Sequence, residues 1–375
     1  MNPQLPTPTP SFEISDVVMA DGSAAASLVS LHAGGLVASV LSYGAALVSF
    51  EAPDRAGHLA NCVVTLADPG DLADPALNPH LGGIVGPYAN RIAGAAFDLD
   101  GVHVRLEANE GPNTLHSGSA TWDRRRWDIA SMSADATSAQ LSLTLIDADG
   151  SGGFPGRVEV TATYVLHEDG TLTLNVEYTC DRPTVVAPTS HTYWNLGAAG
   201  TVAGQRLTLR ADTVLELGAG QIPTGAALPV AGSAWDLRDD VPLRDRLGLD
   251  ALADTGGYDH TYLVGGACGS DLSVVAMLVD PASGRSLEMR TNQPAVHLYT
   301  GNHLGGQPGP LGPIPQHGGV CLEAGQVPNG PNLTAIDGPD GPIPVDVTIR
   351  PGETRRWVTS WRLGFEASPA QVPPG

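Results

Sequence analysis

The feature that most constrains the fold is a series of short segments in which apolar and polar residues alternate. Val158–Leu166 and Thr171–Tyr178 alternate in this way, and the turn sequence His167-Glu168-Asp169-Gly170 joins them. A period of two predicts strands with one buried face, and the joined pair predicts a hairpin. The other predicted strands are Leu36–Ser42, Ala46–Glu51, Cys62–Leu66, Leu141–Ile146, Leu207–Arg210, Ser273–Leu278, Ser286–Arg290, Val296–Tyr299, Val345–Ile349 and Arg356–Trp361.

Turn-forming residues separate these segments along the whole chain. Glycine and proline make up 77 of 375 residues, about a fifth, so turns must be frequent. Helical periodicity is nearly absent, and only Pro69–Ala76 and Leu243–Leu252 predict short helical turns. No repeat of 20–50 residues is visible, which disfavours a propeller or solenoid. The sequence therefore predicts an all-β fold, either a sandwich or a barrel.

The domain organisation follows from where the composition changes. Residues 1–10 are rich in proline and threonine and are predicted to form a flexible arm. No later change in composition marks a boundary, so residues 11–375 are predicted to form a single domain.

Charge and cysteine usage limit the functional classes. The net charge of −21 argues against nucleic-acid partners, because phosphate backbones select basic surfaces. Four separated cysteines without a CxxC pair exclude a zinc knuckle and indicate reduced thiols; they are Cys62, Cys180, Cys268 and Cys321. No signal peptide or membrane-spanning apolar run is apparent, so we expect a cytoplasmic protein without a membrane partner.

Five stretches interrupt the strand pattern with dense polar chemistry. They contain Asn90-Arg91, His116, His191 with Tyr193 and Trp194, Asp259-His260, and Glu323. Three of them also have a structural explanation: Arg91 in a buried ion pair, His116 exposed on a loop, and His191 with Trp194 in the core. Neighbouring residues of a strand face opposite sides, so only one of Asp259 and His260 is expected to face a shared cavity. Glu323 ends an apolar run, where a carboxylate without a partner is costly.

These residue types limit the chemistry that a common site would perform. One carboxylate and one imidazole are sufficient for acid–base catalysis of sugar ring opening. No GxSxG elbow, phosphate loop or HExxH motif occurs. The alternatives are a non-catalytic carbohydrate-binding sandwich and a cupin-like metal enzyme with His116, His191, His297 and Glu323 as ligands. A third alternative is a glycosidase that uses Asp259 and Glu323 as its two carboxylates. A sugar-phosphate epimerase would need a further basic cluster, and Arg124–Arg126 lies in a segment that is predicted to be surface.

Together, in order and spacing, the five stretches resemble the aldose 1-epimerases, also called galactose mutarotases. GPYANRIAGAAF is similar to the family's G-x-x-A-N-R-I-x-x-x-x-F, and NEGPNTLHSG to N-x-G-x-N-x-L-H-G-G. SHTYWNLGAAG resembles N-H-x-Y-F/W-N-L, and GGYDHTYLV resembles Y-D-H-x-F/Y. QHGGVCLEAGQVPNGPN is similar to H-x-G-x-C-L-E-T-Q-x-x-P-D-x-x-N. The agreement extends from about Phe12 to Arg362.

The resemblance implies a large antiparallel β-sandwich, the galactose mutarotase-like supersandwich, that interconverts the α and β anomers of a free monosaccharide. It implies Glu323 as general base and His191 as general acid, with no metal or other cofactor. The implied substrate-binding residues are Asn90, Arg91, His116, Tyr193, Asp259 and His297. From the chemistry, Glu323 must be ionised while His191 is protonated, and Asp259 is expected to favour that imidazolium. We expect a monomer or homodimer.

Five positions depart from the family pattern beside the implied site. Ser117 stands where the family has the first glycine after the histidine, and Ala324-Gly325 replaces Thr-Gln after the glutamate. Asn329 replaces aspartate, and His297 falls where some members place glutamine. These departures bear on which sugar is bound more than on the type of reaction.

Overall fold

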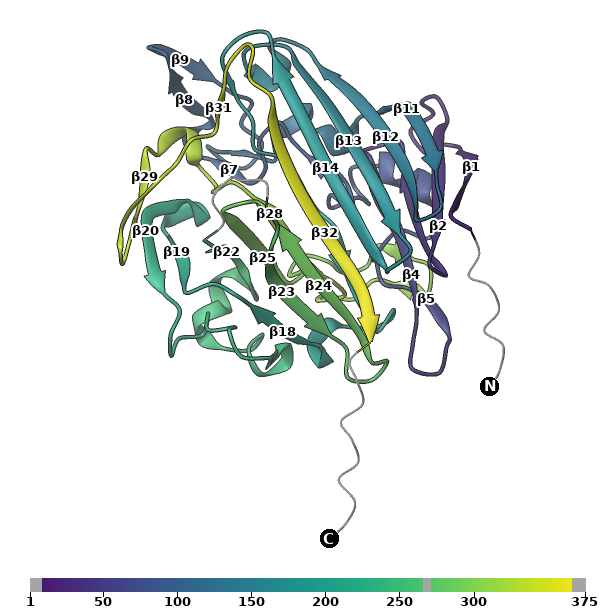
Figure 1. Ribbon diagram of the computed structural model, residues 1–375. Helices are drawn as coiled ribbons and strands as arrows, with labels where there is room; N and C mark the ends of the chain where they lie inside the picture. Colours follow the sequence, from purple (N-terminus) through teal and green to yellow (C-terminus); the bar gives the residue numbers. More distant parts are fainter. Residues whose placement is uncertain (1–8, 266–270, 366–375) are drawn as a thin grey trace.

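The computed structural model describes residues 9–265 and 271–365, and it is built from strands, short 3-10 helices and turns (Figure 1). Of the predicted arm at residues 1–10, residues 1–8 lie outside these ranges, and so does Cys268. Three sheets hold most of the strands, and nearly all pairs of strands are antiparallel. The predicted all-β class and the large antiparallel β-sandwich are confirmed. The prediction that residues 11–375 form a single domain stays a prediction.

The largest sheet has nine strands and contains the predicted hairpin as its third and fourth strands. The turn at residues 167–170 joins β13 to β14, with Val160 opposite Tyr178 and Leu166 opposite Leu172. In spatial order the strands are β11 (Asp128–Ala134), β12 (Ser138–Asp147), β13 (Val158–His167), β14 (Thr171–Cys180), β32 (Arg355–Phe365), β24 (Arg285–Thr291), β23 (Ser273–Val279), β18 (Arg206–Leu209) and β21 (Val241–Pro242).

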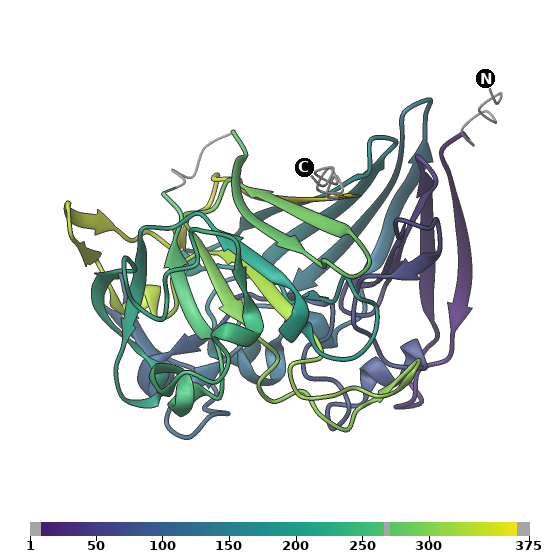
Figure 2. The ribbon, with the colours of Figure 1, turned by 90° about the horizontal axis from the view of Figure 1, so that it is seen from below.

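An eight-stranded sheet forms the second layer, and Figure 2 shows the curved layers from below. Its spatial order is β17 (Tyr193–Trp194), β28 (Val320–Gly325), β25 (Ala295–Tyr299), β22 (Asp259–Leu263), β19 (Thr213–Leu217), β20 (Pro223–Pro229), β29 (Ala335–Gly338) and β30 (Gly341–Pro344). The contact between β20 and β29 is parallel. Because the inward side chains of both layers interdigitate, Leu298 and Leu322 share one core with Met289 and Trp361.

A five-stranded sheet lies along the edge of the first layer, where β2 contacts β12 and β13. Its strands are β1 (Ser11–Val17), β2 (Ala26–Ala33), β3 (Leu36–Leu41), β4 (Ala46–Pro53) and β5 (Leu59–Asn61). Five two-stranded ribbons complete the described strands: β6 (Ile84–Val85) with β16 (Thr189–Ser190), β7 (Arg91–Ile92) with β10 (Thr114–Leu115), β8 (Ala96–Leu99) with β9 (Val102–Arg105), β15 (Thr184–Val185) with β31 (Thr348–Ile349), and β26 (Pro308–Gly309) with β27 (Gly312–Pro313).

Short 3-10 helices occur where the chain turns, as predicted for Pro69–Ala76 and Leu243–Leu252. They are η1 (Pro69–Ala73), η2 (Ala93–Ala95), η3 (Gly118–Ala120), η4 (Trp122–Arg124), η5 (Ser151–Gly153), η6 (Val202–Gly204), η7 (Ala219–Gln221), η8 (Leu243–Asp245), η9 (Asp250–Thr255) and η10 (Gly330–Asn332). Within the described ranges, no helix is both long and apolar enough to span a bilayer.

Two predicted strands are wrong for a local reason. Cys62–Leu66 forms only a single bridge, at Val63, because the side chain of Asn61 accepts the N–H groups of Phe50 and Val63 at 3.0 and 2.9 Å. In Val345–Ile349 only the last two residues pair, and the Asp346 carboxylate accepts the N–H of Thr348 at 3.1 Å. In the first case the Asn61 side chain takes backbone donors that a ladder would otherwise use, whereas Thr348 still pairs with Val185.

The prediction that the segment around Arg124–Arg126 is surface holds only for Arg126, which is exposed, whereas Arg124 and Arg125 are half-buried. Trp122 and Trp127 are fully buried in the main core. Arg125 forms an ion pair with the buried Asp147 at 2.6 Å, so its charge is neutralised within the fold. The prediction of reduced thiols is confirmed for the described cysteines Cys62, Cys180 and Cys321.

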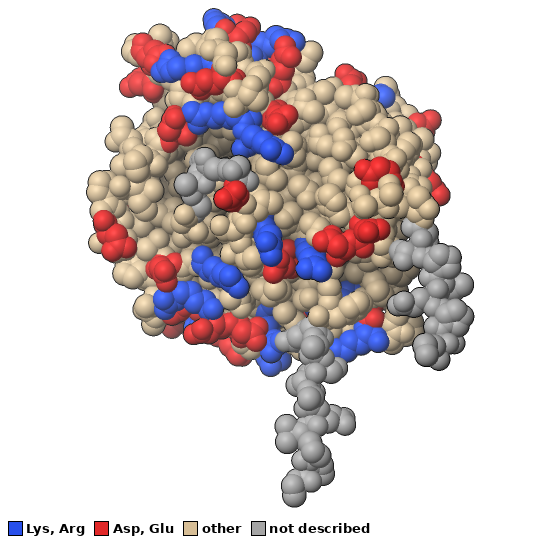
Figure 3. All heavy atoms as spheres, in the orientation of Figure 1, with Lys and Arg blue, Asp and Glu red and all other residues tan. Residues whose placement is uncertain are grey.

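The face drawn in Figure 3 carries acidic and basic side chains interspersed. The exposed ion pairs of the protein include Arg350 with Asp100 at 2.8 Å. Exposed pairs of this kind contribute little to stability. On this face no single sign of charge gathers into a patch.

Candidate active site

The site begins with strand register in the eight-stranded sheet. His297 on β25 lies directly opposite Glu323 on β28, and Thr261 on β22 lies opposite His297 on its other side. Two residues along each strand, a second row joins Asp259, Tyr299 and Cys321, and β17 adds Tyr193 opposite Cys321. Side chains two residues apart share one face of a sheet, so both rows face the same side. We call Tyr193, Asp259, His297, Tyr299, Cys321 and Glu323 the sheet side of the site.

The residues between these positions point into the core. His260 packs against Trp235 and Tyr258, with ring centroids 5.7 and 6.3 Å away. The expectation that only one of Asp259 and His260 faces the cavity is therefore confirmed. Trp194 likewise lies in the core, 5.6 Å from Trp361 between ring centroids, because its neighbour Tyr193 occupies the other face.

Loops and two-residue strands form the other wall, which we call the loop side and define as His80, Asn90, Arg91, His116 and His191. Three of these residues have left-handed backbone conformations, with φ of 65° at His80, 63° at Asn90 and 50° at His116. Asparagine tolerates this region, but histidine adopts it at a cost and persists there only where surrounding contacts hold it. Strained residues of this kind cluster at functional sites.

Hydrogen bonds hold the loop side in register. The backbone N–H of Asn90 donates to His116 Nδ1 at 3.1 Å, and the His116 N–H donates to the Asn90 carbonyl at 3.1 Å. Across the cavity, Asn90 Nδ2 lies 3.5 Å from His297 Nε2, which links the two sides. Burial and the neighbouring His80 hold the pKa of His116 well below its usual value, so this imidazole is neutral.

Arg91 is fixed by a bidentate ion pair. Its Nε and Nη2 atoms donate to the two carboxylate oxygens of Glu110 at 2.7 and 2.8 Å. A planar guanidinium makes such a pair with defined geometry, whereas a lysine does not. The ion pair predicted from the sequence is present, and Arg91 also lines the cavity; its role in binding a substrate stays a prediction.

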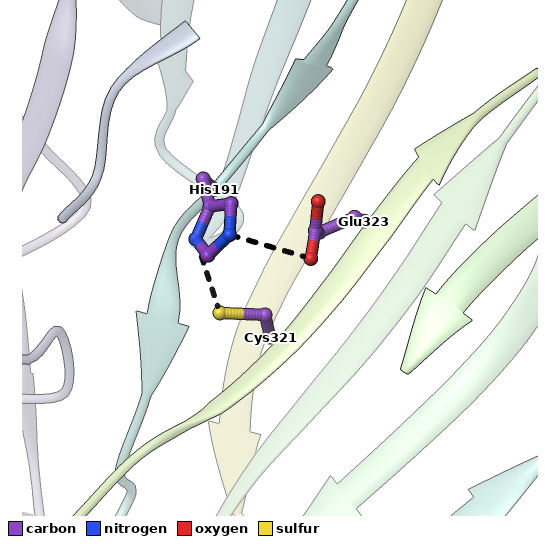
Figure 4. Close-up of side chains that lie close together, drawn as sticks. All are labelled: His191, Cys321 and Glu323. Carbon is purple, nitrogen blue, oxygen red and sulfur yellow. Dashed lines mark hydrogen bonds and ion pairs between the residues drawn. The ribbon is translucent and has the colours of Figure 1, made fainter. Parts of the chain in front are cut away.

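The central contact joins the two sides (Figure 4). His191 Nε2 lies 3.6 Å from Glu323 Oε1, and His191 Nδ1 lies 3.5 Å from Cys321 Sγ. The imidazole thus stands between a thiol and a carboxylate, and each contacts a different ring nitrogen. His191 is 5% exposed and Glu323 4% exposed, so water screens neither group well.

Burial shifts these groups toward their neutral forms. Burial raises the pKa of Glu323 to about 7. The charge of His297 lowers this pKa, but by less than burial raises it. Burial lowers the pKa of His191 to about 3, and the nearby His80 acts in the same direction. Between about pH 3 and 7, the single proton that the pair carries therefore resides on the carboxyl. The sequence had led us to expect that proton on the imidazole.

Asp259 has a different partner from the one expected. It was expected to favour the imidazolium of His191, but it accepts from His297 Nε2 at 2.7 Å, while His297 Nδ1 contacts Thr261 Oγ1 at 2.8 Å. Burial opposes charge on His297, yet the hydrogen bond and charge of Asp259 outweigh it and raise the pKa of His297. The register explains this pairing, because β22 and β25 are adjacent strands while His191 enters from a loop.

The two sides enclose a cavity of about 260 Å³. All eight residues selected from the sequence line it: Asn90, Arg91, His116, His191, Tyr193, Asp259, His297 and Glu323. Sequence reasoning missed His80, Glu110, Tyr299 and His303, which also line it. Two signals were available: Glu110 lies inside NEGPNTLHSG, and Tyr299 follows His297 by one strand period.

Metal binding at this site has a geometric limit. One ligand atom from each of His191, Cys321 and Glu323 lies within 4.8 Å of the others. However, the thiol and the carboxylate approach opposite nitrogens of one ring, whereas an ion binds only one of them (Figure 4). The arrangement suits a chain of hydrogen bonds better than a shared metal ligand set.

Fold and site together define a class: an all-β protein with a polar cavity, in which a buried carboxylate and an imidazole are placed for acid–base chemistry. Comparisons with known proteins agree. The family model described as aldose 1-epimerase matches residues 27–362. The chain is 33% identical to the galactose mutarotase of Sus scrofa over 86% of this chain and 90% of that one. It is 32% identical to the aldose 1-epimerase of Escherichia coli strain K12 over 88% and 92%, respectively.

A solved structure supports the same assignment. The galactose 1-epimerase from Lactobacillus acidophilus NCFM superposes with a TM-score of 0.82 at 27% identity, over 95% of this chain and 99% of that one. The chain belongs to the aldose 1-epimerase family. It is an isomerase that interconverts the anomers of a sugar.

Proposed function

We propose that the cavity binds one free monosaccharide and that Glu323 and His191 open and close its ring. The observation that carries this proposal is the 3.6 Å contact between the two groups inside the cavity. The volume of about 260 Å³ lies just below the range of roughly 300–1,000 Å³ that is typical of drug-sized ligands, which suits a small sugar.

In the proposed reaction, Glu323 takes the proton of the C1 hydroxyl and His191 gives a proton to the ring oxygen. The C1–O5 bond breaks, C1 becomes an aldehyde, and rotation about C1–C2 presents its other face. Ring closure then reverses both proton transfers and restores the starting protonation. Each positioned proton transfer contributes typically about 10²–10⁴-fold to the rate.

The pKa directions define which protonation state is active. Between about pH 3 and 7, Glu323 and His191 together carry one proton. The active form, with ionised Glu323 and protonated His191, also carries one proton in total. It is therefore the less populated of the two forms in which the pair holds a single proton. A sugar favours it by donating its C1 hydroxyl to the carboxylate, since hydrogen bonds to a charged form stabilise that form. We therefore expect the rate to depend on pH in a bell-shaped curve. Its two apparent pKa values belong to the coupled pair and not to either residue alone.

Cys321 has a positioning role in this scheme. Burial raises the pKa of its thiol well above the usual value, so the thiol stays neutral. A neutral S–H donates to His191 Nδ1, which leaves the proton of the neutral imidazole on Nε2, beside Glu323. Asn90, Arg91, His116, Tyr193, Asp259 and His297 are proposed to hold the sugar hydroxyls.

The non-catalytic alternative explains less of the geometry. A binding protein uses Arg91 and the aromatic side chains, but it has no need for a buried carboxylate whose charged form is disfavoured. The cytoplasmic location and the monomeric or homodimeric state stay predictions, and light scattering in solution tests the latter.

Polarimetry tests the proposal. Freshly dissolved α-anomers of several pentoses and hexoses are followed to equilibrium with wild type, Glu323→Gln and, as control, Glu288→Gln on β24. We expect acceleration by wild type and the control and little by Glu323→Gln, with sugar binding by calorimetry retained in all three. Equal rates for wild type and Glu323→Gln would remove Glu323 as the base. Binding without acceleration by wild type would establish the non-catalytic alternative.

A further inference from the structure

The segment that carries His80 is anchored next to His191. The Asn78 side chain accepts the Leu81 N–H at 2.7 Å and donates to the Leu72 carbonyl at 2.8 Å. The Gly82 N–H then donates to the His191 carbonyl at 3.1 Å. These bonds hold His80 in its left-handed conformation at the edge of the cavity. The sequence motifs of the chain give no reason for a histidine here, yet the fold maintains it at a conformational cost.

A buried carboxylate orients this histidine. His80 Nδ1 lies 2.7 Å from Asp123 Oδ2, and the Asp123 side chain is 1% exposed. Burial alone would raise the pKa of Asp123, but the charge and hydrogen bond of His80, with a hydrogen bond from Thr121, hold that pKa below its usual value. A Cβ at Gly83 would approach Asp123 Cβ to 2.4 Å, so only glycine fits beside the carboxylate.

The pairing decides which ring atom of His80 is available to a ligand. An ionised carboxylate only accepts hydrogen bonds, so His80 Nδ1 carries a proton and donates it to Asp123. The other nitrogen, Nε2, remains for the cavity that His80 lines. The ring lies 4.7 Å from the His116 ring and 5.8 Å from the His191 ring between centroids. His80 is thus part of the same wall as two residues of the proposed sugar site.

We propose that His80, oriented by the positioning residue Asp123, is a further substrate-binding residue that contacts one hydroxyl of the sugar through Nε2. The inference rests on the proposed function for the identity of the ligand class. It adds a contact that sets which hydroxyl pattern the cavity selects. A site that hydrogen-bonds a hydroxyl discriminates against a sugar that lacks it, because its own polar group is then left without a partner.

Two substitutions at position 80 separate the roles of the two nitrogens. In His80→Asn, the amide tolerates the left-handed backbone and offers an N–H near the former Nδ1, but it removes Nε2. In His80→Gln, the amide reaches toward the former Nε2 position. The matched control is His103→Asn, since His103 forms an exposed pair with Asp98 at 2.8 Å on the β8–β9 hairpin.

Calorimetric binding and steady-state kinetics are measured with a parent sugar and its singly deoxygenated analogues. We expect His80→Asn to raise Kd and KM for the parent roughly three- to tenfold, the value of one neutral hydrogen bond, with kcat changed less than KM. One deoxy sugar is expected to bind wild type as weakly as it binds His80→Asn. His80→Gln is expected to recover part of the loss, and His103→Asn to match wild type.

Discrimination among the deoxy sugars that is identical in wild type and His80→Asn would overturn the contact. A wild type that binds the sugars but does not turn them over would contradict the proposed reaction, while the binding panel still decides the His80 contact. Absence of binding for every sugar overturns both. For Asp123→Asn, an amide donor facing Nδ1 is expected to move the proton to Nε2, which nitrogen-15 chemical shifts of the ring report; an unchanged tautomer would remove Asp123 as the positioning residue.

Discussion

The sheet side and the loop side of the site place polar groups by different means. On the sheet side, the pairing of β22, β25 and β28 sets His297 beside Glu323 with no special backbone conformation. On the loop side, left-handed residues and loop hydrogen bonds bring His80, Asn90 and His116 to the cavity. The sheet side positions its groups through a ladder shared with the core. The loop side carries local strain that its surroundings must hold.

The difference also appears in charge. The sheet side contains a charged pair, Asp259 with His297, beside the carboxyl of Glu323. On the loop side, His116 and His191 have depressed pKa values and are neutral near pH 7. We infer that the sheet ladder holds the charged pair of Asp259 and His297, while the loop side supplies neutral histidines suited to hydroxyls and one charge, Arg91, which Glu110 fixes. Each prediction below tests one part of this division.

The largest expected effect comes from the contact that joins the two sides. Glu323→Gln and His191→Asn are each expected to lower kcat by about 10²–10⁴-fold, with small changes in sugar binding. Because the two groups share one proton, the double variant is expected to lose about as much as the more severe single variant. Initial rates by polarimetry for the four proteins measure this. Losses that multiply would show independent roles and would break the link between the two sides.

The next effect is on stability and belongs to the sheet side alone. Burial raises the pKa of Glu323 from 4.5 to about 7, so the folded state holds this proton more tightly than the unfolded chain. Its contribution to the free energy of unfolding is thus fully present below about pH 4.5 and is lost as the pH rises through 7. Glu323→Gln carries no such penalty. The free energy of unfolding of Glu323→Gln minus that of wild type is therefore expected to be larger at pH 8 than at pH 4.5, by up to about 3 kcal/mol.

Urea denaturation at the two pH values checks this difference, with Glu288→Gln as control because Glu288 is paired with Arg290 on a strand of the other layer. A pH-independent difference between wild type and Glu323→Gln would mean that the carboxylate is ionised in the folded protein without a penalty. The active protonation state proposed above would then be wrong.

How much of this could be predicted from the sequence differs between the two sides. On the sheet side, alternation alone placed Asp259 and His260 on opposite faces, and two-residue spacing explains why Tyr299 and Cys321 accompany His297 and Glu323. The partner of Asp259 was missed, because strand order is a property of the fold and no local pattern reveals that β22 lies beside β25.

On the loop side, the resemblance supplied Asn90, Arg91, His116 and His191, whereas residue patterns alone left each open to a structural explanation. His80 escaped both approaches, since its partner Asp123 is 43 positions away in a segment that was predicted to be surface. The protonation order of Glu323 and His191 was also beyond the sequence, because it depends on burial and not on residue type.

A smaller effect is expected from the ion pair on the loop side. Arg91→Lys keeps the charge but loses the bidentate contact with Glu110, so the side chain is no longer fixed at the cavity. We expect KM to rise roughly three- to tenfold with kcat nearly unchanged. Arg350→Lys is the matched control, because Arg350 makes the same type of pair with Asp100 on the surface. A fall in kcat without a rise in KM would assign chemistry, and not binding, to this part of the loop side.

The smallest expected effect tests the thiol that joins the sheet side to His191. Cys321→Ala removes the donor to His191 Nδ1, so the neutral imidazole divides its population between two tautomers and only one of them places a proton on Nε2. Because the thiol is one weak contact that holds this ring with Nε2 toward Glu323, we expect kcat to fall by only about two- to fivefold. Cys321→Ser retains a donor and is expected to keep more of the rate. Stopped-flow polarimetry compares the variants, and nitrogen-15 shifts of His191 report the tautomer. Equal rates and equal tautomers in the two variants would reduce Cys321 to packing and leave the register of β28 as the only control of this histidine from the sheet side.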